Sequence, residues 1–293
     1  MSTKPAGLTV LFWNVNLDPE NSTELSDSED ITAVIGAYIA TYQVDLIILA
    51  EATRDYAFKL LVKLSETDDW DLLQIDNYKN KEVSRAGVVL FRKHIHIFDV
   101  GSIKITSTPG NTVPRGRVIY LDEFKLILAC IHLKSKGKTK EGQIPNESSR
   151  VYDVISKAIR ERHERKKTAC IIMGDFNQHP YESDLAKQFE KQYEVSPVRE
   201  NNGYYHPFAA LWGDGEHQIK GTYCLKLSPK AKKNKRPTWW MYDYALFSPQ
   251  AASQLDLKFL KSYPAIANAH LQEKSVAPSD HAPVLFRLKT QAR

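Results

Sequence analysis

The feature that most constrains this chain is a set of short apolar runs that each lead into a polar or ionisable residue. Residues 169–173 form one such run, with the length and bulk of a buried strand, and Asp175 and Asn177 follow it. Polar groups at the ends of buried strands are costly unless the strand ends converge on a site. In layered α/β proteins, sites form at strand ends. The residues that stand at or beside such ends are Asn14, Glu51, His132, Asp175, Asn177, Asp243, Asp280 and His281.

The stretch from Gly174 to Pro180 has two interpretations. Gly-Asp and Asn-x-x-Pro are ordinary turn formers, so the polar residues there fit a plain turn. Alternatively, Gly174 ends the strand, and Asp175 and Asn177 project to the same side at strand spacing. A carboxylate that orients a nucleophile and an amide that donates to developing charge would then act together.

Hydrophobic periodicity predicts a layered α/β chain. Apolar runs predict strands at 8–13, 44–50, 70–75, 169–173, 238–247 and 283–288, and helical spacing predicts helices at 31–42, 54–65, 148–167 and 182–192. Successive strands at 86–91, 95–100, 117–121 and 125–132 indicate a second, largely antiparallel region. No internal repeat or long linker divides the 293 residues, so we expect a single domain over residues 1–293.

Composition narrows the class of protein. Hydrophobic residues make up 42% and charged residues 26%, which is ordinary for a soluble globular protein. No apolar run approaches the roughly 18 residues of a membrane span, and the first residues lack a signal-peptide core, so we expect a cytoplasmic monomer. The three cysteines, Cys130, Cys170 and Cys224, form no CxxC pair and predict reduced thiols rather than a disulfide or zinc site.

The polar residues at the strand ends have a particular chemistry. The set contains carboxylate and amide oxygens and no thiolate, which suits a hard cation such as Mg²⁺ or Mn²⁺. The two histidines, His132 and His281, have candidate acid partners, which suits activation of water or protonation of an oxyanion.

The chain resembles the endonuclease/exonuclease/phosphatase superfamily, whose members have a DNase I-like fold. The resemblance lies in FWNVN (12–16), DLIILAEATRD (45–55), CIHLKSK (130–136), MGDFNQHP (173–180), YDYALFSP (242–249) and SDHAPVLF (279–286), which occur in the family's order. GDFN and SDH together form a specific signal. The resemblance implies a four-layer α/β/β/α sandwich of two packed mixed sheets and metal-dependent cleavage of phosphate esters.

The resemblance also implies roles for single residues. Glu51 resembles the principal ligand of Mg²⁺ or Mn²⁺, and Asn14 and Asp280 resemble additional ligands. His281 resembles the general base or the phosphate-contacting histidine, with Asp243 as the acid that orients it. Asp175 and Asn177 resemble the pair that orients the water and steadies the phosphoryl oxygens. His132 resembles a second histidine of the DNase I-like and sphingomyelinase-like branches.

The sequence departs from secreted DNases at one place. In those enzymes a glutamate before the middle strand pairs with the second histidine, whereas Arg85 stands at the corresponding place here and Glu82 has a different offset. The partner of His132 is therefore left open by the sequence.

Two runs of basic residues indicate the charge and length of the substrate. Lys226, Lys230, Lys232, Lys233, Lys235 and Arg236 precede the Asp243 strand, and Lys134, Lys136, Lys138 and Lys140 follow His132. Each run alone fits a solvated loop. Two such runs attached to site elements, with a formal net charge of +5, favour an extended polyanion.

Two arginines are further candidates for substrate contact. Arg115 and Arg117 flank a predicted turn and either face the phosphate cleft or are solvated. The leading hypothesis is a Mg²⁺-dependent nuclease, with DNA favoured over RNA. The alternatives are a phospholipid or inositol-phosphate hydrolase of the same fold and an inactive binding module.

Overall fold

The structure of the chain is a computed structural model. It describes residues 7–17, 28–73, 83–84, 87–108, 111–133, 143–161, 168–180, 203–208, 222–225, 238–262 and 279–289. The predicted helix at 182–192 and the two lysine-rich runs lie outside these residues. Among the described helices, none is both long and apolar enough to cross a bilayer.

The first sheet has five strands in the order β14-β1-β2-β6-β4. Strands β1 and β2 are parallel, and the other neighbours are antiparallel, so the sheet is mixed. Its strands are β1 (Gly7–Asn14), β2 (Leu46–Ala50), β4 (Trp70–Leu72), β6 (Val88–Arg92) and β14 (Val284–Lys289).

The second sheet has five strands in the order β13-β10-β9-β8-β7. Strands β9 and β10 are parallel and the other pairs are antiparallel, so this sheet is largely antiparallel, as predicted. The predicted strand 86–91 does not belong to it, because that strand is β6 of the first sheet. Its strands are β7 (Ile97–Thr108), β8 (Asn111–Leu121), β9 (Leu126–His132), β10 (Ala169–Asp175) and β13 (Asp243–Phe247).

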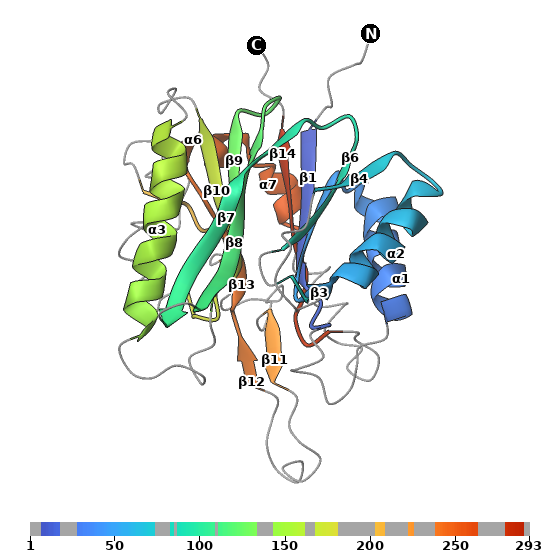
Figure 1. The fold of residues 1–293 in the computed structure, drawn as a ribbon. Helices are drawn as coiled ribbons and strands as arrows, with labels where there is room; N and C mark the ends of the chain where they lie inside the picture. Colours follow the sequence, from blue (N-terminus) through green and yellow to red (C-terminus); the bar gives the residue numbers. More distant parts are fainter. Residues whose placement is uncertain are drawn as a thin grey trace.

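Helices cover the outer faces of the two sheets, which gives the expected four-layer α/β/β/α sandwich (Figure 1). Helices α1 (Ser28–Tyr42) and α2 (Arg54–Ser65) lie on the first sheet, and α3 (Gln143–Glu161) lies on the second. The remaining elements are α6 (Pro249–Gln254), α7 (Leu257–Leu260) and two short strand pairs, β3 (Ala52–Thr53) with β5 (Val83–Ser84) and β11 (Tyr223–Leu225) with β12 (Thr238–Trp240).

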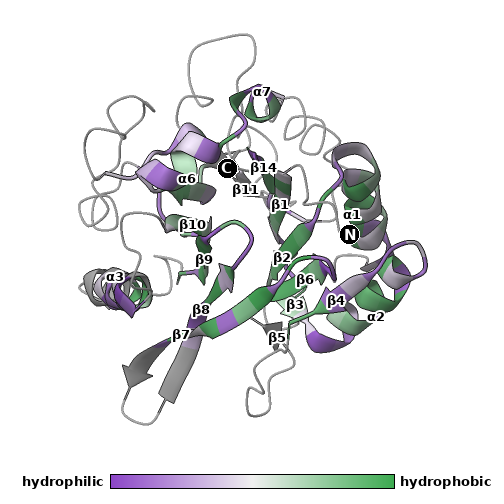
Figure 2. Cartoon of the chain, turned by 90° about the horizontal axis from the view of Figure 1, so that it is seen from above, coloured by the Kyte–Doolittle hydropathy of each residue, from purple (hydrophilic) through white to green (hydrophobic). Residues whose placement is uncertain are grey.

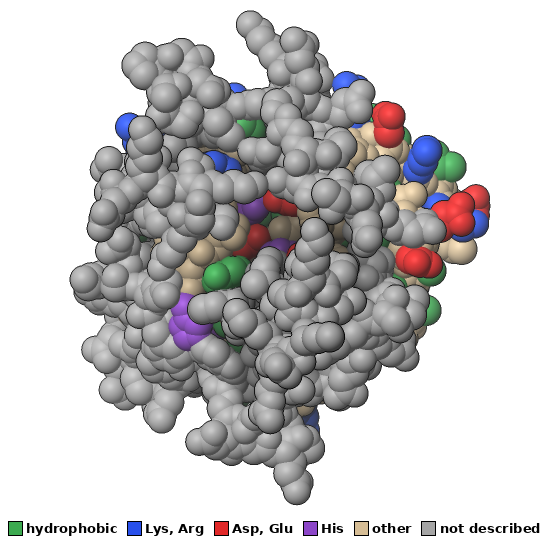
Figure 3. Space-filling view, turned by 90° about the horizontal axis from the view of Figure 1, so that it is seen from below, with side chains coloured by type: hydrophobic (Ala, Val, Ile, Leu, Met, Phe, Trp, Pro, Cys, Tyr) green, Lys and Arg blue, Asp and Glu red, His purple; other side chains and the backbone are tan. Residues whose placement is uncertain are grey.

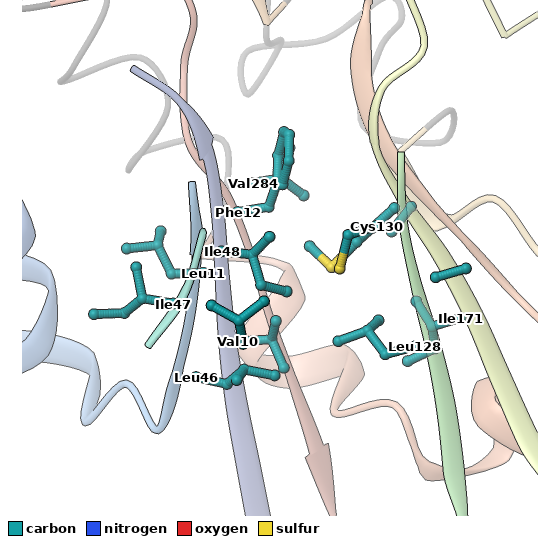
Figure 4. Packing of buried hydrophobic residues seen from close by; sticks show 14 of the residues in the cluster. Val10, Leu11, Phe12, Leu46, Ile47, Ile48, Leu128, Cys130, Ile171 and Val284 are labelled. Carbon is teal, nitrogen blue, oxygen red and sulfur yellow. The ribbon is translucent and has the colours of Figure 1, made fainter. Parts of the chain in front are cut away.

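The apolar core between the sheets comes from alternate strand residues. Val10, Phe12 and Ile48 of the first sheet point toward Leu128 and Cys130 of the second, whereas Leu11 and Ile47 point away, toward the helices (Figure 4). Seen from above, strands β1, β2 and β6 are mostly hydrophobic, and hydrophilic residues gather on the helices and turns around them (Figure 2). Both faces of the first sheet are therefore buried, as continuous apolar runs predict.

Several predicted boundaries are wrong in detail. The predicted strand 238–247 is two strands, β12 and β13, and α3 begins five residues earlier than predicted. Strand β10 does not end at Gly174 but continues to Asp175. Gly174 has φ +149°, and a Cβ there would lie 1.9 Å from the carbonyl oxygen of Ile131. Glycine is thus needed for the close approach of β10 to β9, not for a turn.

Arg115 and Arg117 do not flank a turn. Both lie within β8, and their exposed fractions are 8% and 1%. The predicted alternative of two solvated arginines is therefore wrong.

Candidate active site

The candidate site lies at the strand ends, just beyond the core residues that face the space between the two sheets. On β1, Asn14 faces the same side as Val10 and Phe12, because alternate residues of a strand share a face. On β9, His132 likewise shares a face with Leu128 and Cys130. On β10, Asp175 shares a face with Ile171 and Met173. The strand register sets these ends side by side, because Asp175 pairs with His132 on one side and with Asp243 on the other. The polar residues thus collect where the two sheets meet.

The side chains at this edge are close together and mostly buried. Asn14, Glu51, His132, Asp175, Asp243 and His281 are each 9% exposed or less. Viewed from below, acidic and histidine side chains lie together in a hollow of this face (Figure 3). Asn14 Nδ2 donates to Asp175 Oδ2 at 3.1 Å, which links the ends of the two sheets.

Glu51 reaches the site through an unusual backbone conformation. Ile48 faces the other sheet, and so by alternation does Ala50, so a regular strand would direct Glu51 toward the helices. Glu51 instead has φ +53°, in the left-handed region that residues other than glycine seldom occupy. Asn16 and Asn177 have the same conformation, with φ of +49° and +48°. Such conformations often occur at functional sites.

The structure identifies the partner of His132, which the sequence left open. His132 Nε2 lies 3.3 Å from Glu51 Oε1 and 3.7 Å from Asp175 Oδ2. Arg85 lies outside the described residues. A predicted cation ligand, Glu51, therefore also orients the second histidine.

His281 and Asp243 form the predicted pair. His281 Nδ1 lies 2.8 Å from Asp243 Oδ2, and both side chains are buried. Burial alone would lower the pKa of His281, but the carboxylates of Asp243, Asp175 and Asp280 raise it to about 10. His281 is therefore a cation at neutral pH, with Nδ1 occupied by Asp243. This favours the phosphate-contacting role over the general-base role.

Asp175 has a strongly perturbed acidity. Burial raises the pKa of Asp175 to about 8, and the neighbouring Asp243 carboxylate adds to the rise. Its Oδ1 accepts the Asn177 N–H at 2.8 Å. Asn177 does not project beside it in strand alternation, because β10 ends at Asp175 and the Asn177 side chain donates to the carbonyl of Leu133 at 2.8 Å. Asn177 thus orients Asp175 through its backbone.

The donor set fits a hard divalent cation. The predicted ligands Asn14, Glu51 and Asp280 stand at the ends of the adjacent strands β1, β2 and β14 and supply only oxygen. Asp280 Oδ1 is oriented by Asn16 Nδ2 at 3.2 Å. A second place for a cation lies at the carboxylates of Asp175 and Asp243, whose ligand atoms are within 4.8 Å of each other and of a ring nitrogen of His281. Buried carboxylates this close together repel one another, so a cation would relieve that repulsion.

Two hydroxyl residues that sequence reasoning did not single out hold this arrangement. Ser279 donates to the Asn14 carbonyl at 2.7 Å and accepts the His281 N–H at 3.2 Å. Thr222 Oγ1 accepts the N–H groups of Tyr242 and Asp243. Ser279 is the first residue of the SDH motif, which was the available signal for it, but its bond to Asn14 joins residues 265 positions apart. Thr222 is 21 positions from Asp243, and no sequence signal pointed to it.

The substrate-contact residues are only partly described. Arg117 is buried within β8, and its Nη2 lies 3.9 Å from Asp99 Oδ2. Arg115 lies closer to the site, since Gly116 pairs with Ile131 and the next residue of β9 is His132. Lys134, Lys232, Lys233, Lys235 and Arg236 lie outside the described residues.

The perturbed acidities predict how stability depends on pH. In the folded protein Asp175 and His281 bind protons more tightly than in the unfolded chain, because both pKa values are raised. The folded state is thus stabilised at low pH and loses stability as pH rises, through about pH 4–8 for Asp175 and about pH 6.5–10 for His281. Each extra proton changes the free energy of unfolding by about 1.4 kcal/mol per pH unit.

We therefore expect the melting temperature in EDTA to fall between pH 6 and pH 9, and to fall less in Asp175→Asn. Melts followed by circular dichroism at several pH values test this. Asp69→Asn, at an exposed position, is the control. Equal slopes in wild type and Asp175→Asn would contradict the assignment.

Comparison with known proteins identifies the family. Residues 11–281 match the model of the endonuclease/exonuclease/phosphatase family. No curated protein sequence matches the chain. Among solved structures, TDP2 from C. elegans superposes with a TM-score of 0.60 at 16% identity, covering 97% of this chain and 75% of that one.

Two further structures have the same fold. The human Nocturnin catalytic domain with bound sulfate matches with a TM-score of 0.57 at 16% identity, covering 98% of this chain and 95% of that one. D. rerio TDP2 in complex with a single-strand DNA product matches with a TM-score of 0.55 at 16% identity, covering 98% of this chain and all of that one. The predicted DNase I-like fold is confirmed, and the chain belongs to the endonuclease/exonuclease/phosphatase family.

Proposed function

We propose that this protein is a Mg²⁺-dependent phosphodiesterase that hydrolyses nucleic acid, with DNA favoured over RNA. The observation that carries the proposal is the buried cluster of Glu51, His132, Asp175, Asp243 and His281 at the common end of the two sheets. It combines oxygen ligands for a hard cation with one cationic histidine and two carboxyl groups, Asp175 and Asp243, whose pKa values are raised by burial.

Each residue of the site has its own role in the proposed hydrolysis. Asn14, Glu51 and Asp280 would hold Mg²⁺ or Mn²⁺, which supplies Lewis-acid stabilisation of the phosphoryl oxygens. Asp175, with a pKa near the working pH, accepts a proton from the attacking water. The oxygen of that water bonds to phosphorus as the ester oxygen departs, and His132 is the candidate donor of a proton to the departing oxygen. His281, held by Asp243, stabilises negative charge on the phosphoryl group.

We propose that Arg115 contacts the substrate phosphate. Between β7 and β8 the register passes from Ile103↔Gly116 to Lys104↔Pro114, so Arg115 is the extra residue of a β-bulge. Bulges beside active sites re-aim a side chain. The bulge lies next to His132, and a planar guanidinium matches two phosphate oxygens at once.

Nucleic acid is favoured by charge and by analogy. The segment 226–236 contains six cations and no acidic residue, and it stands in the sequence between β11 and β12, shortly before the strand that begins with Asp243. D. rerio TDP2, of the same fold, was solved with a single-strand DNA product. The test is incubation of the purified protein with single- and double-stranded DNA, RNA and phospholipid vesicles, each with Mg²⁺, Mn²⁺ or EDTA. Cleavage of phospholipid but not nucleic acid would overturn the proposed substrate.

The lysine-rich segment gives a second, sharper test. Replacing Lys232, Lys233, Lys235 and Arg236 with serine should weaken binding to long oligonucleotides, because contacts with backbone phosphates are lost. Each lost contact should lower the log–log salt slope by roughly 0.7–0.9. Turnover at saturating substrate should change little, since the site itself is untouched.

The measurement is steady-state cleavage of a long oligonucleotide and of bis(p-nitrophenyl) phosphate across a salt series. The short diester serves as the control, because it has no backbone phosphates beyond the scissile one. An unchanged salt slope for the oligonucleotide would remove the main physical support for nucleic acid.

A further inference from the structure

Three aromatic rings form a buried stack beside the two site aspartates. The rings of Phe176 and Tyr244 stack with centroids 3.8 Å apart and planes 8° apart. His206 stacks on Tyr244 at 4.8 Å and 17°. Exposed fractions of 0% for Phe176 and His206 and 1% for Tyr244 show that no ring is in contact with bulk solvent. We call these three side chains the aromatic stack.

The aromatic stack lies on the backbone that carries Asp175 and Asp243. Phe176 directly follows Asp175, and Tyr244 directly follows Asp243. Because Asp243 faces the other sheet, alternation places the Tyr244 ring on the opposite face of the second sheet. Tyr244 pairs there with Gly174, which has no side chain and cannot carry one. Aromatic rings commonly cover such glycines.

The cross-strand pair of Asp175 and Asp243 needs support of this kind. The two residues are directly opposite in the register, and like charges in that position push strands apart. The N–H of Phe176 still donates to the Tyr242 carbonyl at 2.8 Å, so the two strands stay joined just beyond the pair.

His206 is held against the stack by a separate segment of chain. The preceding residue, Tyr205, forms an isolated antiparallel bridge with Phe247 of β13, with N–H···O distances of 2.7 and 2.8 Å. This bridge lies beyond β13, the edge strand of the second sheet. The imidazole thus packs on Tyr244 from a segment that lies beyond the edge strand, and it is not one of the acids and histidines of the site.

We propose that His206 is a positioning residue for the active site. Its ring stacks on Tyr244 and thereby fixes the backbone from which Asp175 and Asp243 project. The proposal rests on the function proposed above and extends it to a residue outside the site. The property required of residue 206 is a flat ring that stacks. Loss of the ring should misplace the two carboxylates by a fraction of an ångström without touching the substrate.

The test compares His206→Leu, which replaces the ring with an apolar side chain of similar size, with His206→Phe, which keeps a ring. Phe259→Leu is the matched control, because it removes a ring that packs on Tyr42 and Arg287 beside the far end of the first sheet. We would measure kcat and KM for bis(p-nitrophenyl) phosphate, the Mn²⁺ affinity by electron paramagnetic resonance, and the melting temperature.

We expect His206→Leu to lower kcat by about 10-fold or more, since an ångström of misplacement costs roughly 10²-fold. KM should stay nearly unchanged, the Mn²⁺ affinity should weaken, and His206→Phe should restore both kcat and affinity. Phe259→Leu should lower the melting temperature without lowering kcat. Unchanged kcat and Mn²⁺ affinity in His206→Leu, or no restoration by His206→Phe, would overturn the proposal.

The two proposals fail in distinguishable ways. If the wild-type protein cleaves no phosphodiester, the proposed function is wrong, and the Mn²⁺ affinities alone then decide the role of His206. If the wild type cleaves the diester and His206→Leu is equally active, only the role of His206 is wrong.

Discussion

Replacing Glu51 with glutamine should lower phosphodiester turnover by roughly two orders of magnitude or more, as expected when a metal centre is lost. Glutamine keeps the shape of the side chain and an oxygen that can face His132 Nε2, but it removes the charge that binds a cation. Glu51 is buried, and left-handed backbone brings its carboxylate to the site. Folding should survive, because glutamine needs no change of that backbone.

The measurement for Glu51→Gln is cleavage of bis(p-nitrophenyl) phosphate over a Mg²⁺ titration, with Mn²⁺ affinity as a readout independent of activity. Glu66→Gln is the control, since Glu66 is exposed and pairs only with Lys63 among the described residues. Full activity of Glu51→Gln in saturating EDTA would exclude the metal-dependent mechanism.

Replacing His281 with alanine should lower kcat by at least ~10²-fold, the range for loss of one group that stabilises transition-state charge. Asp243→Asn should cost a similar amount through the same imidazole. Asp243 Oδ2 lies 2.8 Å from Nδ1 of His281 and is the first of the neighbouring carboxylates that raise its pKa to about 10. Without that carboxylate the buried imidazole loses much of its positive charge at neutral pH. The double variant should be no slower than the slower single variant, because the two residues act as a unit.

The control pair is His96 and Glu123, another contact between a histidine and an acid, in which the histidine is 75% exposed. His96→Ala and Glu123→Gln should leave kcat unchanged. Steady-state kinetics of the four single variants and the His281–Asp243 double variant complete the experiment. A double variant much slower than either single variant would show that His281 and Asp243 act independently.

Local sequence patterns predicted most of the helices and strands and the polar residues at the strand ends. Apolar runs and helical spacing predicted β2, β9, α2 and β14 nearly to the residue, because strand and helix periods are local properties of the chain. The same runs located the strand ends, and their polar residues do meet at one edge. Within each sheet the register explains this meeting, since parallel β1/β2 and β9/β10 bring their last residues to the same side.

Only the tertiary structure decided which of these residues contact one another. Glu51 pairs with His132 because left-handed backbone at Glu51 breaks the strand alternation. Asn177 turns away to Leu133 for the same reason, although alternation predicted that it would project beside Asp175. The burial of Arg115 depends on a bulge that pairing with β7 creates. Such conformations are set by contacts between segments distant in the sequence, as the Ser279–Asn14 bond across 265 positions illustrates, and no local pattern encodes them.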